Sequence, residues 1–236
     1  MNRQNLFEGI RDGVPIGLGY FAVSFAFGMM AVSGGLSIGQ AVLISVTNLT
    51  SAGQFAGLDI MLAGGALLEM AMTQLVINLR YSLMSFSLAQ KLDDGGHLAH
   101  RFVVAFGVTD EIFGISAARQ GRLSPYYCYG AMLVAIPGWT LGTLCGAISG
   151  SLLPPRIMSA LSVAIYGMFL AIILPPARQD RRILAVVIAA MLISAGFYYL
   201  PVLNQISSGI VIIITTLLVA GIAAWIAPIQ PENPPQ

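Results

Sequence analysis

The sequence carries little charge and few of the side chains that do chemistry. Only 9% of its 236 residues are Asp, Glu, Lys or Arg, whereas soluble domains carry about 25%. The formal net charge of +1 excludes the basic face that a nucleic-acid-binding protein needs. The two histidines, His97 and His100, stand in one polar loop, and no H-E-x-x-H motif is present. We therefore expect no nucleic-acid partner, no metal or other cofactor, and no enzymatic activity.

Cysteine is also scarce. Cys128 and Cys145 fall in one predicted helix, which places them roughly 25 Å apart along its axis at about 1.5 Å per residue. A disulfide requires Cα atoms within about 7 Å of each other. We therefore expect two free thiols that pack as small apolar side chains.

Apolar residues are what the sequence does contain, at 57% of the chain. This composition predicts an all-α integral membrane protein, because a helix satisfies its backbone hydrogen bonds internally within lipid. The length leaves room for about seven to eight transmembrane helices of about 20 residues. We expect a cytoplasmic N-terminal segment over 1–13, a multi-pass transmembrane domain over 14–228 and a proline-rich, disordered tail over 229–236.

Some of the expected helices are short or broken. Pro15 suits the start of the first span, Pro137 interrupts a later one, and Gly53 among small polar residues marks a second break. Broken helices at membrane depth are tolerated only where they line protein or a wet cavity. The apolar runs predict eight spans in all: 14–32, two within 39–90 that divide near Leu58-Asp59 or Gly64-Gly65, 101–118, 127–149, 157–174, 183–200 and 206–226.

The distribution of basic residues predicts the orientation. Cytoplasmic loops of membrane proteins carry an excess of Lys and Arg. With eight spans and a cytoplasmic N-terminus, the inside would hold most of the basic residues, namely Arg3, Arg11, Arg119, Arg122, Arg178, Arg181 and Arg182, and the outside only Lys91, Arg101 and Arg156. Both termini are therefore expected in the cytoplasm.

Charged residues inside the predicted spans need an explanation. Arg80 lies in a helix that also carries Asn78, and Asp110 and Glu111 lie in the middle of the span 101–118. Each charge near the centre of a bilayer costs roughly 2.5–3.5 kcal/mol on insertion scales, and intramembrane ionisable groups usually pair. Neighbouring helix residues point about 100° apart, so Asp110 and Glu111 face different directions.

Several motifs together resemble one known family. They are PIGLGYFAVSFAFG at 15–28, SAGQFA at 51–56, NLRYSLMSFSLA at 78–89, TDEIF at 109–113, and the Trp139-Thr140-x-Gly142 pattern. In this order they resemble the AzlC family of branched-chain amino acid permeases, which are mainly exporters. The resemblance implies an inner-membrane transporter. It also implies a small AzlD-type membrane subunit as partner, because members of this family typically work as a two-component pair.

An amino acid substrate requires particular chemistry. Its carboxylate favours an arginine or a helix N-terminus, and its ammonium favours carboxylate or carbonyl oxygens. Arg80 meets either the substrate carboxylate or Asp110 or Glu111, and the ion pair is the favoured alternative. Gln54, Asn78 and Ser51 are then the expected substrate contacts. Because burial raises the pKa of a carboxyl group towards physiological pH, Asp110 or Glu111 is the expected proton-coupling group.

Two other kinds of protein remain compatible with the sequence. The same scaffold would serve as a transporter or channel for a different small solute. It would also serve as an assembly subunit that transports nothing itself.

Overall fold

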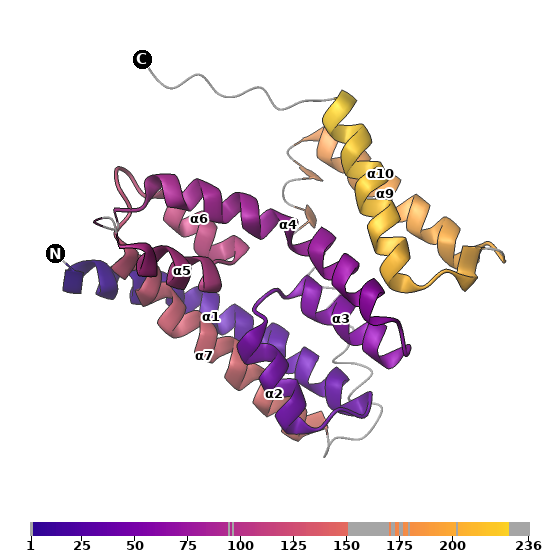
Figure 1. Cartoon of the computed structure of the whole chain (residues 1–236), viewed down its shortest axis with the longest axis horizontal. Helices are drawn as coiled ribbons and strands as arrows, with labels where there is room; N and C mark the ends of the chain where they lie inside the picture. Colours follow the sequence, from indigo (N-terminus) through magenta and orange to yellow (C-terminus); the bar gives the residue numbers. More distant parts are fainter. Residues whose placement is uncertain are drawn as a thin grey trace. The chain divides into compact units, whose positions relative to one another are not determined.

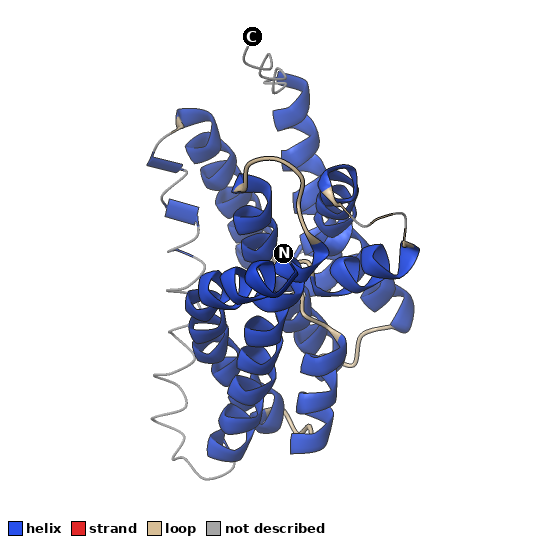
Figure 2. Ribbon diagram, turned by 90° about the vertical axis from the view of Figure 1, so that its left-hand side faces the viewer, coloured by secondary structure: helices blue, strands red, loops and turns tan. Residues whose placement is uncertain are grey.

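The computed structural model describes residues 2–93, 95, 97–150, 170, 173–174, 177–178, 180–201 and 203–226. Every named element in these residues is a helix (Figures 1 and 2). The helices are α1 (Asn2–Ser33), α2 (Ile38–Thr47), α3 (Ala52–Leu62), α4 (Leu67–Lys91), α5 (Leu98–Gly107), α6 (Asp110–Ala118), α7 (Pro125–Gly150), α9 (Arg181–Tyr199), the short 3-10 helix η1 (Leu203–Gln205) and α10 (Ser208–Ile226).

Length and composition make this an all-α membrane protein, as the sequence predicts. In the described residues, four helical segments are long and apolar enough to cross a membrane, namely Arg3–Ser33, Pro125–Gly150, Arg181–Tyr199 and Ser208–Ile226. Two shorter helices, α2 and α5, are also apolar. Most of the span expected at 157–174, and the tail expected at 229–236, lie outside the described residues.

The chain forms two compact units. Unit 1 comprises Met1–Leu58 and Asn78–Ile165, and unit 2 comprises Asp59–Ile77 and Tyr166–Gln236. Unit 1 contains α1, α2, α5, α6, α7 and the adjoining parts of α3 and α4. In unit 2, α9 and α10 pack against each other and η1 connects them.

A parallel pair of long helices, α1 and α7, forms the centre of unit 1. Gly9 of α1 lies against the backbone of Tyr127 near the start of α7, and Gly146 near the end of α7 lies against the Phe25 carbonyl of α1. A Cβ on Gly146 would overlap that carbonyl oxygen. Because small residues let helix backbones approach closely within a membrane, glycine at these contacts sets the register of the pair.

Both prolines that were expected to mark helix boundaries lie inside continuous helices. Pro15 is in the interior of α1, and α7 passes through Pro137 without interruption. The predictions that Pro15 starts a helix and that Pro137 interrupts one are therefore wrong. A proline removes one backbone hydrogen bond, and membrane helices tolerate this loss where neighbouring groups compensate.

The segment expected to cross as one span over 101–118 is instead a hairpin of two short helices. α5 ends at Gly107 and α6 begins at Asp110, with the Thr109 side chain accepting a hydrogen bond from the backbone N–H of Ile112 at 3.3 Å. The Lys91 ammonium, at the end of α4, donates to main-chain carbonyls at the end of α6, including that of Ala117. The end of α6 therefore returns to the level at which α5 begins.

Backbone pairing also places the end of α4 beside the start of α7. Leu92, just after α4, pairs with Leu123, just before α7, in an isolated parallel bridge. The Arg119 guanidinium in the loop after α6 forms an ion pair with Glu8 of α1 at 2.6 Å. The start of α1, the end of α4 with Leu92, and the loop 119–124 therefore share one end of unit 1, which we call the basic end (Figure 1).

The expected placement of Lys91 and Arg101 opposite Arg119 and Arg122 is therefore wrong, because the segment between them turns back. All the basic residues described in unit 1 except Arg80 lie towards the basic end: Arg3, Arg11, Lys91, Arg101, Arg119 and Arg122. The asymmetry is stronger than the sequence alone indicates. Because cytoplasmic loops carry an excess of Lys and Arg, this asymmetry favours a cytoplasmic location for the basic end. The orientation of the N-terminus stays a prediction.

The helix break expected near Gly53 is present a few residues earlier. α2 starts with a capping box between Ser37 and Gln40 and ends at Thr47. Ser51 takes the left-handed backbone conformation at φ 45°, which is uncommon for a residue other than glycine. Gly53 itself lies inside α3. The boundary between α3 and α4 falls at the second of the two expected positions, where Gly64 has φ 68°.

Candidate functional site

A buried chain of hydrogen bonds connects the first helix break to α7. The Gln54 amide nitrogen donates to the Ser45 hydroxyl at 2.6 Å, and the Trp139 indole N–H donates to the Gln54 amide oxygen at 3.0 Å. The Ser45 and Thr143 hydroxyls lie 2.7 Å apart. All four side chains are buried. Since an unpaired polar group costs several kcal/mol in a medium without water, this mutual pairing explains how the four polar groups coexist with an apolar surround.

Local structure places these side chains. The break at 48–51 puts Gln54 in the first turn of α3 and leaves Ser45 near the end of α2. Trp139 and Thr143 are four residues apart on α7, and they therefore share one face of that helix. One face of α7 thus holds both short helices beside the break.

A second cluster surrounds the other break, at the start of α6. The Arg80 guanidinium of α4 lies 2.7 Å from the Asp110 carboxylate, with both side chains a little under half exposed. The guanidinium also lies 5.0 Å from the centre of the Tyr81 ring. Asp110 and Glu111 occupy the first turn of α6, where the helix dipole favours negative charge.

Glu111 has a different partner from its neighbour. Its carboxylate accepts a hydrogen bond from the Tyr20 hydroxyl of α1, whereas Asp110 faces α4. The two acids therefore point towards different helices, as their spacing of about 100° around a helix requires.

Tyr20 connects the two clusters. Its ring packs edge-on against Trp139, with ring centres 5.4 Å apart and planes at 78°. The same residue thus binds the carboxylate at one helix break and contacts the indole that binds Gln54 at the other. These residues, all within unit 1, form the candidate site, which consists of Tyr20, Ser45, Gln54, Arg80, Asp110, Glu111, Trp139 and Thr143.

The predicted site residues fall into two groups. Arg80, Asp110 and Glu111 come together, and their role in coupling stays a prediction. The Gln54 amide is engaged by protein groups at both ends, so in this state it is a structural part of the site and not an open substrate contact. Ser51 lies in the first break, and Asn78 is partly buried on α4, two residues before Arg80 and so on a different helix face.

Sequence reasoning missed four members of the site. Tyr20, Ser45, Trp139 and Thr143 were not predicted as site residues, although Tyr20 and Trp139 occur within the family-like motifs. The break before α6 did have a sequence signal. A threonine followed by two acidic residues before an apolar run is typical of a helix N-terminus, and Thr109-Asp110-Glu111 fits that pattern.

The basic end carries a separate set of polar contacts. The Arg119 guanidinium lies over the Tyr127 ring at 4.2 Å, and the Tyr127 hydroxyl donates to Asp12 at 2.9 Å. The hydrogen bond to Glu8 raises the pKa of Arg119. Tyr127 is thus buried between α1 and α7.

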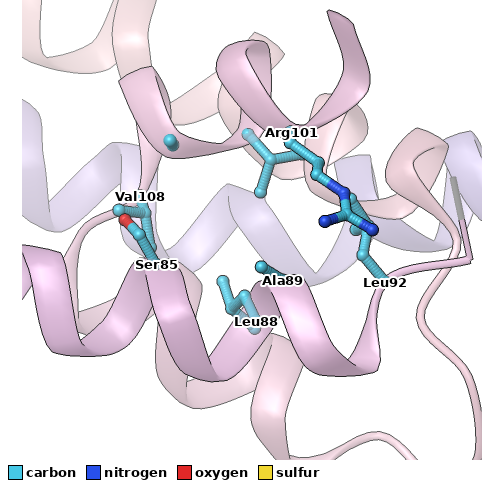
Figure 3. Close-up of a pocket in the computed structure, with 8 residues that line it drawn as sticks. Ser85, Leu88, Ala89, Leu92, Arg101 and Val108 are labelled. Atoms are coloured by element: carbon cyan, nitrogen blue, oxygen red, sulfur yellow. The ribbon is translucent and has the colours of Figure 1, made fainter. Parts of the chain in front are cut away.

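One pocket between α4 and α5 is unsuited to a zwitterion. Its lining is largely apolar, including Leu88, Ala89 and Val108, with Ser85 and Arg101 as the polar contributions (Figure 3). It has no carboxylate to bind an ammonium group. Among the residues that the structure describes, no group of three or more His, Cys, Asp or Glu side chains is placed to hold a metal ion.

The helices, the paired charges at a helix break and the polar groups buried inside unit 1 define a multi-pass membrane protein with an internal polar site. The family model described as "AzlC protein" matches residues 15–153, and this chain belongs to that family. Membership supports a transport role in the membrane.

Individual proteins agree with this assignment. The chain is 30% identical over 211 residues to the "Inner membrane protein YgaZ" of Escherichia coli, covering 86% of each chain. It is 33% identical over 170 residues to an "Uncharacterized membrane protein" of Archaeoglobus fulgidus, covering 71% of this chain and 74% of that protein. A Helicobacter pylori membrane protein is 25% identical over 155 residues. No solved structure matches.

Proposed function

We propose that this protein is an inner-membrane exporter of branched-chain and similar apolar amino acids. The observation that carries the proposal is the pair of helix breaks in unit 1, joined by Tyr20 and Trp139. Transporters commonly bind substrates where discontinuous helices meet, using helix N-termini and irregular backbone. Family membership and the E. coli relative, which is named as an inner membrane protein, support the membrane and the transport class.

The polar groups suit the two charges of an amino acid. The substrate ammonium is proposed to bind at Asp110 and Glu111. The substrate carboxylate is proposed to approach the N-terminal end of α3 beside Ser51, because helix N-termini favour anions. Arg80 is occupied by Asp110 at 2.7 Å, which supports a role in shaping the site over a role as the carboxylate ligand.

The apolar part of the substrate determines how selective such a site is. One methylene in a hydrophobic pocket changes binding by only about 1–3 kcal/mol. Valine, leucine, isoleucine and methionine are therefore expected to share the site.

Transport is proposed to be coupled to an ion, with Asp110 or Glu111 carrying the proton. A carboxyl group that alternates between charged and neutral forms links substrate movement to a proton gradient. A small AzlD-type membrane subunit is proposed as partner on the family resemblance alone.

The test is counterflow of labelled amino acids in proteoliposomes, with the chain reconstituted alone and together with the proposed AzlD-type subunit. We expect exchange of L-leucine and L-valine but not of L-glutamate or L-lysine. Asp110→Asn and Glu111→Gln should abolish concentrative export, while Asp93→Asn, an exposed loop carboxylate, should not. Exchange of an unrelated solute alone would identify a different transporter. Full activity of the partner without this chain would identify an assembly subunit.

A further inference from the structure

Tyr20 is the residue that contacts both halves of the candidate site. It lies on α1, which forms half of the closely packed α1–α7 pair. Its hydroxyl donates to Glu111, and its ring meets the Trp139 ring edge-on at 5.4 Å. Tyr20 thus contacts both a carboxylate at the start of α6 and the indole that binds Gln54.

The two contacts respond differently to chemistry at Glu111. An ionised carboxylate accepts the Tyr20 proton in a charge-assisted hydrogen bond, and such bonds are stronger than neutral ones. A protonated or ammonium-bound Glu111 is a weaker acceptor, so this bond weakens, and the Tyr20 hydroxyl keeps its other hydrogen bond, to the Thr109 side chain. Any resulting movement of the ring changes the surface against which Trp139 packs, and Trp139 holds the Gln54 oxygen.

The charged and titratable groups facing Glu111 come from three helices. Tyr20 faces it from α1 and Tyr81 from α4, and Asp110, which pairs with Arg80, is adjacent on α6. Arg80 is held by Asp110, which leaves the Tyr20 hydroxyl as the direct hydrogen-bond partner of Glu111. This arrangement separates the two acids, one paired with a cation and the other with a neutral donor.

We propose that Tyr20 is a positioning residue that transmits the charge state of Glu111 to the Trp139–Gln54 pair. This role of Tyr20 connects the proposed coupling group, Glu111, to the helix break at which the substrate is proposed to bind. Its relevance to transport rests on the proposed function. The link itself is a property of the protein without substrate and is testable in that state.

The test uses the indole as its own reporter. The chain contains two tryptophans, Trp139 and Trp225, and Trp225 is exposed on α10. The full chain carrying Trp225→Phe therefore reports Trp139 fluorescence alone. In detergent without substrate at pH 7.5, we expect Glu111→Gln, which removes the carboxylate charge, to change the Trp139 emission.

In a Tyr20→Phe background, Glu111→Gln should no longer change the emission, since phenylalanine keeps the ring but has no hydroxyl to donate. Tyr129→Phe is the matched control because it also removes a tyrosine hydroxyl. Tyr129 lies on α7, the helix of Trp139, and its hydroxyl lies 2.6 Å from His100 Nδ1. This substitution should leave the Trp139 response intact. A Glu111→Gln effect on the emission that persists in the Tyr20→Phe background, or that is absent from the Trp225→Phe parent, would overturn the proposal.

A second arm adds L-leucine as the probe. Its binding should change the Trp139 emission of the parent, and Tyr20→Phe should lose that change at saturating L-leucine. A change of equal size in Tyr20→Phe contradicts the proposal. Absence of any L-leucine effect in the parent contradicts the substrate assignment, and the substrate-free arm still decides the role of Tyr20.

Discussion

The Lys91 ammonium donates a hydrogen bond to the main-chain carbonyl of Ala117 at 2.7 Å, although 26 residues separate the two. This bond ties the end of α4 to the end of α6. It also satisfies carbonyls that a helix C-terminus leaves without partners, where a cation is favoured. The intervening chain, α5 and α6, therefore leaves the basic end and returns to it.

The first prediction concerns this hairpin. In a background of Cys128→Ala and Cys145→Ala, cysteines at His97 and Arg122, both exposed, should react with a membrane-impermeant thiol reagent from the same side. We expect that side to be the cytoplasm. A cysteine at Gly39, an exposed position in the first turn of α2 with open space around it, should react from the other side. Labelling of His97→Cys and Arg122→Cys from opposite sides would show that the segment crosses the membrane.

The second prediction concerns the Arg80–Asp110 ion pair. Arg80→Ala leaves an unpaired carboxylate, and Asp110→Asn leaves an unpaired guanidinium. Removing one partner of a fully buried pair costs about 3–5 kcal/mol, and the partial exposure of this pair reduces the expected loss to about 1–3 kcal/mol. The double variant should be more stable than the sum of the two losses implies. Thermal unfolding in detergent measures this coupling, and additive losses would show that the pair contributes nothing.

The third prediction concerns the Gln54 amide. Gln54→Leu leaves the Trp139 N–H without its acceptor, while the Ser45 hydroxyl keeps Thr143 as a partner. An unsatisfied buried group costs about 1–3 kcal/mol. We expect a loss of stability of this size and impaired counterflow. Gln90→Leu is the control, because Gln90 is exposed on α4. Equal stability and transport in both variants would contradict a structural role for Gln54.

The fourth prediction concerns the close approach of α1 and α7. Gly146→Ala places a Cβ against the Phe25 carbonyl, and overpacking of this kind typically costs about 1–3 kcal/mol. Gly19→Ala is the matched control, because a Cβ there meets nothing within 4 Å. It should be neutral or stabilising, since alanine is favoured over glycine within a helix by about 0.5–1 kcal/mol. Unfolding midpoints of the two variants decide the comparison.

Some features of the site could be predicted from the sequence because they follow from local rules. The high cost of charge in lipid pointed to Arg80 and to Asp110 and Glu111. Small polar residues around Gly53 indicated a helix break, and the structure has one at 48–51. These signals concern single segments, which the sequence displays directly.

Other features could not be predicted because they depend on contacts between distant segments. Hydropathy does not distinguish a span from a hairpin of two short helices, so the turn at Val108-Thr109 was missed. Tyr20 and Glu111 are 91 residues apart in the chain, and their contact depends on how the helices pack. Pro15 and Pro137 do not bound helices as the sequence predicts, because both helices continue despite the lost hydrogen bonds.

The parallel α1–α7 pair also constrains how the molecule moves. Two backbones in direct contact at Gly9 and Gly146 have no layer of side chains that would let them slide past each other. This pair is therefore the rigid part of unit 1. In the proposed transport, the short helices beside it would supply the movement, with the breaks at 48–51 and 108–109 as the bending points.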